Sequence, residues 1–396
     1  MAQNWAGTDT GKTQHHCVVL TAQGERLLSR RVLNDEPELP ALLADVPALG
    51  PGVAWAVDVA DGMAALWINV LPNHGQHLVC TPGLAVNRAS AGYRGMGKTD
   101  AKDATVIADQ PRMRRDLTVL LPDDEHAIEL RVLTSRRTGP NADRTRRVNR
   151  LRGQLIDVFP ALERALDLGN VGPLILLTGY QTPAALRRTG RSRLETWLRN
   201  RKVCSPEGLA EAVLEAAERQ HTAVPGEKIT AQVSHTLAKE VMSLNEQIAE
   251  IDKLIAVRFR DHGLADVIAS MPGIGPLLGA EFLAATAGDM SRYGTADRLA
   301  SLAGVSPLPR DSGNVSGNLH RPRRYHRGLQ RVFCTSALIS IRSCDDSRRF
   351  YERKRSEGKR HTQAVLALAR RRVNVLWALI RDGQCYQTNL RVTSAA

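Results

Sequence analysis

Short segments with runs of apolar residues, separated by turn-forming residues, occupy the first part of the chain, a pattern typical of β-strands. Three short segments follow this pattern, namely Trp5 to Thr8, His16 to Leu20 and Arg26 to Val32. The segment Ala22 to Glu25, which separates the last two, has the composition of a turn. The pattern therefore predicts a three-stranded antiparallel meander at the N-terminus.

Helix and strand patterns alternate after the meander. We expect a helix from near Glu36-Pro37-Glu38, a strand from Val53 to Asp58, a helix through Met63 to Trp67 and a strand from Gln76 to Cys80. A meander followed by alternating helices and strands is the order of a ribonuclease-H-like mixed sheet. The first part of the chain is therefore predicted to be an α/β domain.

From about Leu130 to His262 the apolar residues recur at helical spacing. The clearest series alternates spacings of four and three residues, as in a coiled-coil seam: Leu237, Val241, Leu244, Ile248, Ile251 and Ile255. This series predicts a helical hairpin or a coiled coil. An ordinary amphipathic helix facing a core explains it equally well, because the series is short. Oligomerisation through the seam is a hypothesis.

A third region begins with a glycine-containing turn between two predicted helices. In Met271-Pro272-Gly273-Ile274-Gly275-Pro276 the two glycines resemble those of a helix-hairpin-helix turn, whose backbone N–H groups can meet a phosphate. Gly273 and Gly275 are therefore candidate nucleic-acid contacts. A final helix is predicted from Lys359 to Asp382, followed by a loose tail.

The charge balance favours a polyanionic partner. The chain of 396 residues has a formal net charge of +13, and basic side chains that neutralise phosphates release counterions. Arg144 and Arg147 could line one face of a helix along a nucleic-acid backbone, and Arg321, Arg323 and Arg324 lie in a dense basic stretch. A solvated basic face is the alternative interpretation.

Other features exclude several classes of protein. The six cysteines are scattered without a Cys-x-x-Cys pair, which predicts neither a zinc site nor a disulfide framework. The N-terminus lacks the pattern of a signal peptide, and the longest apolar run, around Val171 to Leu177, is too short to span a bilayer. We expect a soluble cytoplasmic protein without a membrane partner.

Four acidic residues stand where the predicted fold would gather them. Asp9 and Asp58 end predicted strands, and Asp100 and Asp103 open a predicted helix, where their spacing puts both on one face. Gathered carboxylates repel one another and are usually held by divalent cations, so Mg²⁺ is the expected cofactor. Taken alone, Asp100 and Asp103 are also typical of a solvated helix N-terminus. Pro111 is expected to end this helix early.

Two segments fit the P-loop pattern and are not interpreted as ATP sites. Gly92 to Thr99 matches it letter for letter, but the preceding Ala85 to Ala91 is not the buried apolar strand that a P-loop needs. Ala6 to Thr13 matches a looser form and continues into a strand. The series Asp9-x-Gly11-x-Thr13 also resembles the phosphate loop of sugar kinases and actin-like ATPases, so an actin-like ATPase remains an alternative.

Four pieces of the chain, in this order, resemble one known family. They are Gly7 to Lys12, Lys98 to Asp103, Met271 to Pro276, and Leu302 to Gly313. Their order and spacing resemble those of the DEDD insertion-sequence transposases of the IS110 group, which includes the Piv-type DNA invertases. The resemblance implies a RuvC-like catalytic domain (1–125), a helical coiled-coil linker (126–262), a mainly helical transposase domain (263–382) and a flexible tail (383–396).

The resemblance also implies a chemistry. Asp9, Asp58, Asp100 and Asp103 would hold Mg²⁺, and Ser312, by default a turn residue, would be the nucleophile of a DNA transposase or site-specific recombinase. Members of the family act on double-stranded DNA as oligomers guided by a structured RNA of the element, which implies a homo-oligomer at the bacterial nucleoid. A RuvC-like metal-dependent nuclease or resolvase that uses the acids alone is the competing hypothesis.

The second acid departs from the family pattern. It is commonly Glu, and Asp58 is one methylene shorter. Asp61 is a weaker candidate for the same place.

Overall fold

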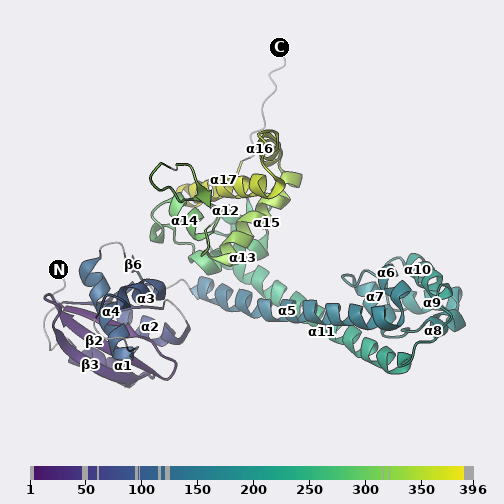
Figure 1. Ribbon diagram of the computed structural model, residues 1–396, viewed down its shortest axis with the longest axis horizontal. Helices are drawn as coiled ribbons and strands as arrows, with labels where there is room; N and C mark the ends of the chain where they lie inside the picture. The colour runs from purple at the N-terminus through teal and green to yellow at the C-terminus, as the bar shows by residue number, and fades with distance from the viewer. Residues whose placement is uncertain are drawn as a thin grey trace, which may run out of the picture. The chain divides into compact units, whose positions relative to one another are not determined.

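The computed structural model describes residues 4–46, 52–59, 62–93, 97, 99–114, 117–120, 125–314, 316–320 and 322–387. The chain folds into two compact units, Met1–Asp124 and Glu125–Ala396, which we call the N-terminal and the C-terminal unit. Figure 1 shows a sheet with helices in the first and helices almost throughout the second. Within the described residues, no helix is long and apolar enough to cross a membrane.

The N-terminal unit is built on one mixed sheet with strand order β3-β2-β1-β4-β5-β6. Its described strands are β1 (Asn4–Asp9), β2 (Gln14–Thr21), β3 (Arg26–Leu33), β4 (Val53–Val57), β5 (His77–Cys80) and β6 (Thr118–Val119). The first three form an antiparallel meander, and β4 and β5 continue parallel to β1. The predicted meander is confirmed, and the mixed sheet is consistent with the predicted ribonuclease-H-like domain.

Helices cover both faces of this sheet. They are α1 (Glu38–Asp45), the 3-10 turn η2 (Gly62–Ala64), α2 (Ala65–Asn73), α3 (Gly83–Ser90) and α4 (Asp100–Met113). Trp55 of β4 points to the face covered by α1 and α2, where its ring lies 5.4 Å from that of Trp67. Its neighbour Ala56 packs on the other face with Val86 of α3 and Val106 of α4. Strand alternation thus gives each helix layer its own core.

The expectation that Pro111 ends the acidic helix early is wrong. Helix α4 runs to Met113 and contains Pro111 in its last turn, buried against the unit's interior. A proline there removes one hydrogen bond, to the carbonyl four residues earlier, but only two helical residues follow it, so the rest of the helix keeps its hydrogen bonds.

Two long helices of the C-terminal unit pair along their length. Helix α5 (Glu125–Val158) lies beside α11 (Glu227–Asp261) (Figure 1). Glu129 near the start of α5 meets Arg258 near the end of α11, and Arg147 further along α5 meets Glu240 nearer the start of α11. The pair is therefore an antiparallel hairpin within one chain, which confirms the predicted helical hairpin.

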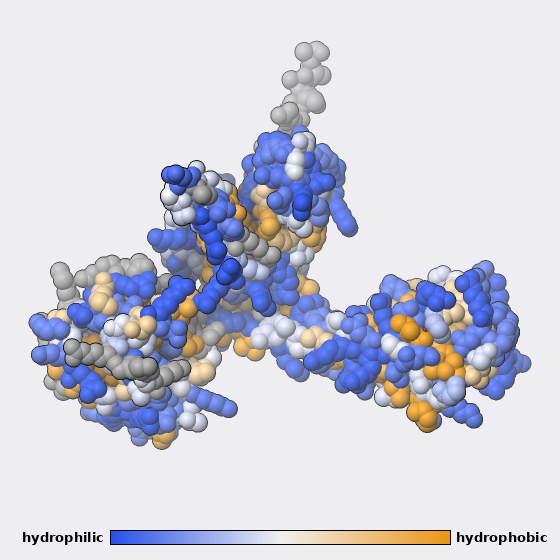
Figure 2. Space-filling view, in the orientation of Figure 1, coloured by the Kyte–Doolittle hydropathy of each residue, from blue (hydrophilic) through white to orange (hydrophobic). Residues whose placement is uncertain are grey.

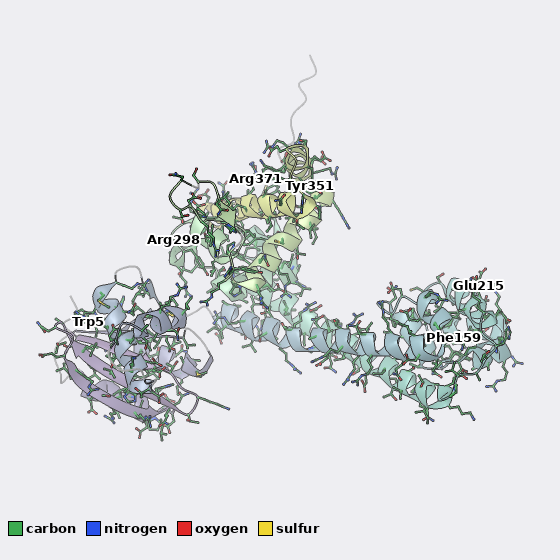
Figure 3. All side chains as sticks on the ribbon, in the orientation of Figure 1. Trp5, Phe159, Glu215, Arg298, Tyr351 and Arg371 are labelled. Carbon is green, nitrogen blue, oxygen red and sulfur yellow. The ribbon has the colours of Figure 1, made fainter. Side chains whose placement is uncertain are left out.

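The far end of the hairpin carries a small helical bundle. Its helices are α6 (Pro160–Ala165), α7 (Val171–Leu177), α8 (Pro183–Thr189), α9 (Arg191–Arg199) and α10 (Pro206–Glu218). Phe159 is buried inside this bundle, whereas Glu215 lies on its surface (Figure 3). On the face of the bundle seen in Figure 2, apolar residues are exposed among hydrophilic ones.

The rest of the C-terminal unit is a helical body with one short hairpin. It contains α12 (Ala265–Ala269), α13 (Pro276–Thr286), η3 (Met290–Arg292), α14 (Ala296–Leu302), β7 (Leu308–Pro309), β8 (Leu319–His320), α15 (Arg327–Ser343), α16 (Asp345–Ser356) and α17 (His361–Asp382). Phe282 and Phe333 meet edge to face in its core, with ring centroids 6.1 Å apart. The final helix is confirmed.

Directly after α17 the chain still contacts the C-terminal unit. The backbone N–H of Tyr386 donates to Ser270 Oγ at 2.8 Å, and that of Gln384 donates to the Leu379 carbonyl at 3.0 Å. Residues 388–396 lie outside the described part.

Candidate active site

Asp9 and Asp58 stand at the ends of adjacent parallel strands. In the register of β1 and β4, Thr8 is opposite Val57, so each acid follows at the same edge of the sheet. Both side chains are partly buried. Thr10, directly after Asp9, donates its hydroxyl to Asp58 Oδ1 at 3.1 Å. The predicted placement of these two acids at neighbouring strand ends is confirmed.

Helix α4 brings the second pair of acids to the sheet. Thr99 caps the helix by accepting from the Lys102 N–H at 3.2 Å, which fixes Asp100 and Asp103 in the first turn. The helix lies directly on β1, because a Cβ added at Gly7 would be 2.1 Å from Ala108 N. A glycine at this strand position therefore permits the approach that positions the acidic turn.

The pKa of Asp58 is shifted by its surroundings. Burial raises its pKa, hydrogen bonds from Thr10 lower it, and the negative charge of Asp103 raises it further, so that the net direction is upward. Asp103 is therefore close enough to disfavour ionisation of Asp58. A nearby cation would relieve this repulsion.

Asp100 is turned toward a different partner. Its Oδ2 lies 3.3 Å from Arg31 Nη2 of β3, and both side chains are more than half exposed. In the part of the chain that the structure describes, no three His, Cys, Asp or Glu side chains lie in an arrangement that could hold a metal ion. Asp9 and Asp58 share one edge of the sheet, Asp103 lies near Asp58, and Asp100 pairs with an arginine. Asp61 lies outside the described residues.

Sequence reasoning missed three neighbours of the acids. Thr10 holds Asp58, Arg31 holds Asp100, and His16 is the strand partner of Asp9. The pKa of His16 is lowered by burial and by the charge of Arg31, and the Asp100 charge opposes this. The strand pattern predicted where these residues lie along the sheet, but only the pairing register shows which acids they face.

Ser312 lies in the short hairpin of the C-terminal unit. The Arg310 N–H donates to the Asn318 carbonyl at 2.8 Å, and the Asn318 N–H donates to Asp311 Oδ1 at 2.9 Å. Gly313 has φ of +54°, a conformation that favours glycine. These contacts present an exposed Ser312 at the end of the loop, and it has no hydrogen-bond partner among the described residues.

The turn at Gly273 has a structural reason for its first glycine. Gly273 has φ of +81°, and an added Cβ would lie 2.6 Å from the Ser336 carbonyl of α15. Gly275 is the N-cap residue directly before α13 and has open space around it. Close packing on α15 thus explains why residue 273 is a glycine. Gly275 is exposed, so a phosphate could reach its backbone.

The candidate arginines differ in what they contact. Arg144 donates to Asn245 Oδ1 at 2.5 Å across the hairpin and to the Gly169 carbonyl, and Arg147 pairs with Glu240 at 2.7 Å. Both therefore also join helices of this chain. Arg323 and Arg324 are exposed shortly after strand β8, and Arg321 lies outside the described residues.

The sequence matches two family models that together cover these sites. A transposase model matches residues 6–160, which include the four acids, and a model of the IS116/IS110/IS902 transposase family matches residues 265–352, which include Ser312. The chain is 54% identical to the insertion element IS900 uncharacterized 42 kDa protein of Mycobacterium paratuberculosis over 96% of both chains. The chain belongs to this transposase family.

Two further relatives extend the comparison. The insertion element IS116 uncharacterized 44.8 kDa protein of Streptomyces clavuligerus is 48% identical over 99% of this chain and 98% of its own. The mini-circle putative transposase for IS117 of Streptomyces coelicolor is 25% identical over 93% of this chain and 91% of its own. Membership of the family implies DNA cleavage and strand transfer.

Proposed function

We propose that this transposase cleaves and rejoins the DNA strands of a mobile element with its edge carboxylates and with Ser312. The observation that carries the proposal is the meeting of Asp9 and Asp58 at one edge of the sheet, with Asp103 close enough to raise the Asp58 pKa. Acids placed this close repel one another and destabilise the fold unless a bound cation offsets their charge.

The oxygen donors suit Mg²⁺. Carboxylates are preferred ligands of this ion, and Asp9, Asp58 and Asp103 supply them, with Asp100 reaching them after release from Arg31. When bound, Mg²⁺ would neutralise charge on the scissile phosphate. Thr10 keeps Asp58 oriented through its hydroxyl hydrogen bond.

Ser312 supplies the nucleophile in this proposal. Its Oγ attacks phosphorus, a Ser–O–P bond forms, and the bond from phosphorus to one deoxyribose oxygen breaks. The serine proton ends on the departing deoxyribose hydroxyl. The phosphodiester bond energy is retained in the protein–DNA link, so strands can be rejoined without ATP. A homo-oligomer guided by a structured RNA of the element, associated with the nucleoid through DNA, completes the proposal.

A hydrolytic nuclease is the second candidate. Ser312 is exposed, and no hydrogen bond from its hydroxyl to a base is found among the described residues, so water could serve as nucleophile beside the acids. Cleavage would then release free ends.

The two mechanisms are separated by incubating the protein with Mg²⁺, the element's DNA ends and its noncoding RNA, followed by a denaturing gel. We expect a covalent protein–DNA adduct from the parent protein and from Ser316→Ala, a neighbouring serine in the same loop. We expect none from Ser312→Ala, with DNA binding retained. Cleavage without an adduct in all three proteins would overturn the serine mechanism in favour of hydrolysis.

A further inference from the structure

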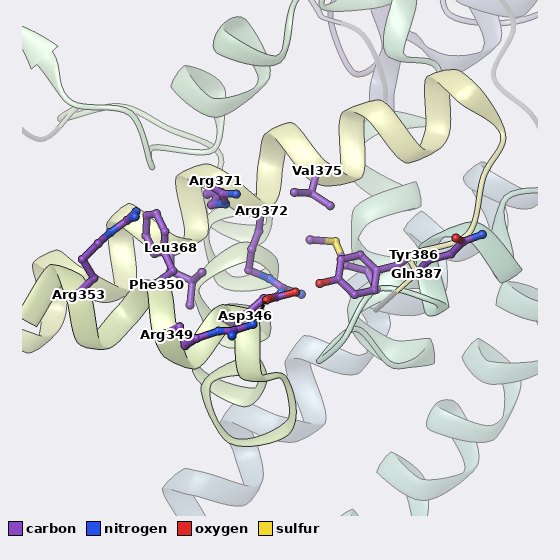
Figure 4. A pocket seen from close by; sticks show the side chains of 12 residues that line it. Asp346, Arg349, Phe350, Arg353, Leu368, Arg371, Arg372, Val375, Tyr386 and Gln387 are labelled. Carbon is purple, nitrogen blue, oxygen red and sulfur yellow. Dashed lines mark hydrogen bonds and ion pairs between the residues drawn. The ribbon is translucent and has the colours of Figure 1, made fainter. Parts of the chain in front are cut away.

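The C-terminal unit contains a cavity of about 550 Å³ that the proposed chemistry does not use. Helices α16 and α17 form its walls, and Tyr386 closes one side (Figure 4). Its charged lining consists of Asp346 and four arginines, which are Arg349, Arg353, Arg371 and Arg372. Even after Asp346 is paired with Arg349 at 2.5 Å, the cavity is strongly positive.

Arg372 is the most constrained of these arginines. It is only 4% exposed, and its guanidinium donates to Ser336 Oγ at 3.0 Å and to the Pro272 carbonyl. No carboxylate pairs with it in the described part of the chain. Burial lowers its pKa to about 10, so it stays charged at neutral pH. A buried charge without a counter-ion is costly, and an anion in the cavity would supply one.

Two more guanidinium groups are held around an aromatic ring at the same cavity. The Cζ atoms of Arg353 and Arg371 lie 5.1 and 5.3 Å from the ring centroid of Phe350. Arg371 has no ion pair among the described residues, and Arg353 has only a long one, 3.8 Å to Glu357. The ring therefore orients two cations without neutralising them.

Tyr386 adds a hydrogen-bond donor. Its hydroxyl lies 3.7 Å from Cys344 Sγ, and burial raises its pKa to about 12, so the hydroxyl keeps its proton at neutral pH. Figure 4 shows the Arg372 side chain extending from α17 into the space between Tyr386 and the side chains of α16. Planar guanidinium groups and a neutral hydroxyl thus line the same cavity, and groups of both kinds match the oxygens of a phosphate group.

We propose that this cavity binds a backbone phosphate of a nucleic-acid strand, with Arg353, Arg371 and Arg372 as its ligands. The phosphate would be the counter-ion that Arg372 lacks, while the two exposed arginines at Phe350 would recruit it from solvent. The site shares no residue with the acids or with Ser312, and it rests on the proposed function only in taking a nucleic acid as the ligand.

The test measures binding in EDTA, where strand cleavage plays no part. Fluorescence anisotropy is recorded over a salt series with two probes, a labelled duplex DNA and a labelled single-stranded RNA. Arg371→Gln and Arg353→Gln are compared with Arg381→Gln, which removes the same charge from an exposed position near the end of α17. These three positions are exposed, so each variant is expected to keep the parent melting temperature.

We expect each cavity variant to weaken binding of at least one probe roughly tenfold and to reduce the salt slope by about one, whereas Arg381→Gln changes little. Arg372→Lys, which keeps the charge and loses the planar fork, should also weaken binding if it stays folded. The probe that loses affinity identifies the strand as DNA or RNA.

Equal losses in Arg381→Gln and in the cavity variants would overturn the proposal, because they would reflect overall charge alone. Sodium phosphate serves as a third probe. If it raises the melting temperature of the parent but not of Arg371→Gln, while both polynucleotides bind unchanged, the cavity takes a small phosphate compound and the strand assignment is wrong. Failure of DNA cleavage in the adduct assay would leave these binding results intact.

Discussion

At the scale of single residues, the candidate site is governed by the conflict between Asp58 and its surroundings. Burial and the Asp103 charge both favour the protonated form, and the Thr10 hydroxyl only partly compensates. The folded state therefore holds this proton more tightly than the unfolded chain does. Stability is lost as pH rises from the unfolded pKa of Asp58 through its folded pKa.

We predict that Asp58→Asn melts at a higher temperature than the parent at neutral pH. The amide keeps an acceptor for Thr10 and removes the buried charge, so the gain should shrink to nothing as pH falls below the ordinary aspartate range. Thermal unfolding across this pH range measures it. Asp100→Asn, which removes only an exposed ion pair, should change the melting temperature little at any pH.

Mg²⁺ provides a second readout of the same residue. It should raise the melting temperature of the parent and leave that of Asp58→Asn nearly unchanged, since the variant has lost a ligand. An equal shift in both proteins would show that the ion binds elsewhere.

At the scale of elements, the acidic turn depends on how closely α4 approaches β1. Gly7 is the point of contact, because Ala104 and Ala108 of the helix leave no room for a Cβ at this position. The small residues on both sides allow helix and strand backbones to touch. The position of Asp103 relative to Asp58 is therefore set two residues before Asp9.

Gly7→Ala should destabilise the protein by about 1 to 3 kcal/mol and move the acidic turn away from the sheet edge. We expect DNA cleavage to fall under conditions where the variant is still fully folded. Gly83→Ala is the matched control, because its added Cβ would meet Asp58 at no less than 3.9 Å. Denaturant unfolding and the cleavage gel measure the two effects, and parent-like behaviour of Gly7→Ala in both would refute this role.

The elements near the chemistry could be predicted because their signals are local. Short apolar segments bounded by turn residues locate β1 to β4, and Thr99 before Asp100 marks the start of α4. The paired partner of α11 could not be predicted from its own seam, since the same pattern fits a core-facing helix. Other features depend on contacts between distant segments, which no local pattern specifies. They are the packing of the α6–α10 bundle, the Arg31–Asp100 ion pair, and the burial of Arg372 without a carboxylate partner among the described residues.

At the scale of the whole molecule, the proposed chemistry divides between two units. The acids belong to the N-terminal unit and Ser312 to the C-terminal unit. We propose that one copy supplies the acids and another supplies the serine, so that cleavage would require assembly.

Mixing two inactive variants tests this division of labour. Asp58→Asn and Ser312→Ala should each form no adduct alone, and a mixture should recover part of the parent yield on the denaturing gel. Recovery is expected because, in a mixed oligomer, the intact acids of a Ser312→Ala copy can act with the intact Ser312 of an Asp58→Asn copy. An inactive mixture that still forms oligomers would mean that each copy uses its own acids and serine.

The proposed bond between Ser312 and DNA can be detected by mass spectrometry of the trapped adduct. After nuclease and protease digestion, we expect a nucleotide phosphate attached to the peptide that contains Ser312. Attachment at any other residue, or cleaved DNA without a modified peptide, would contradict it.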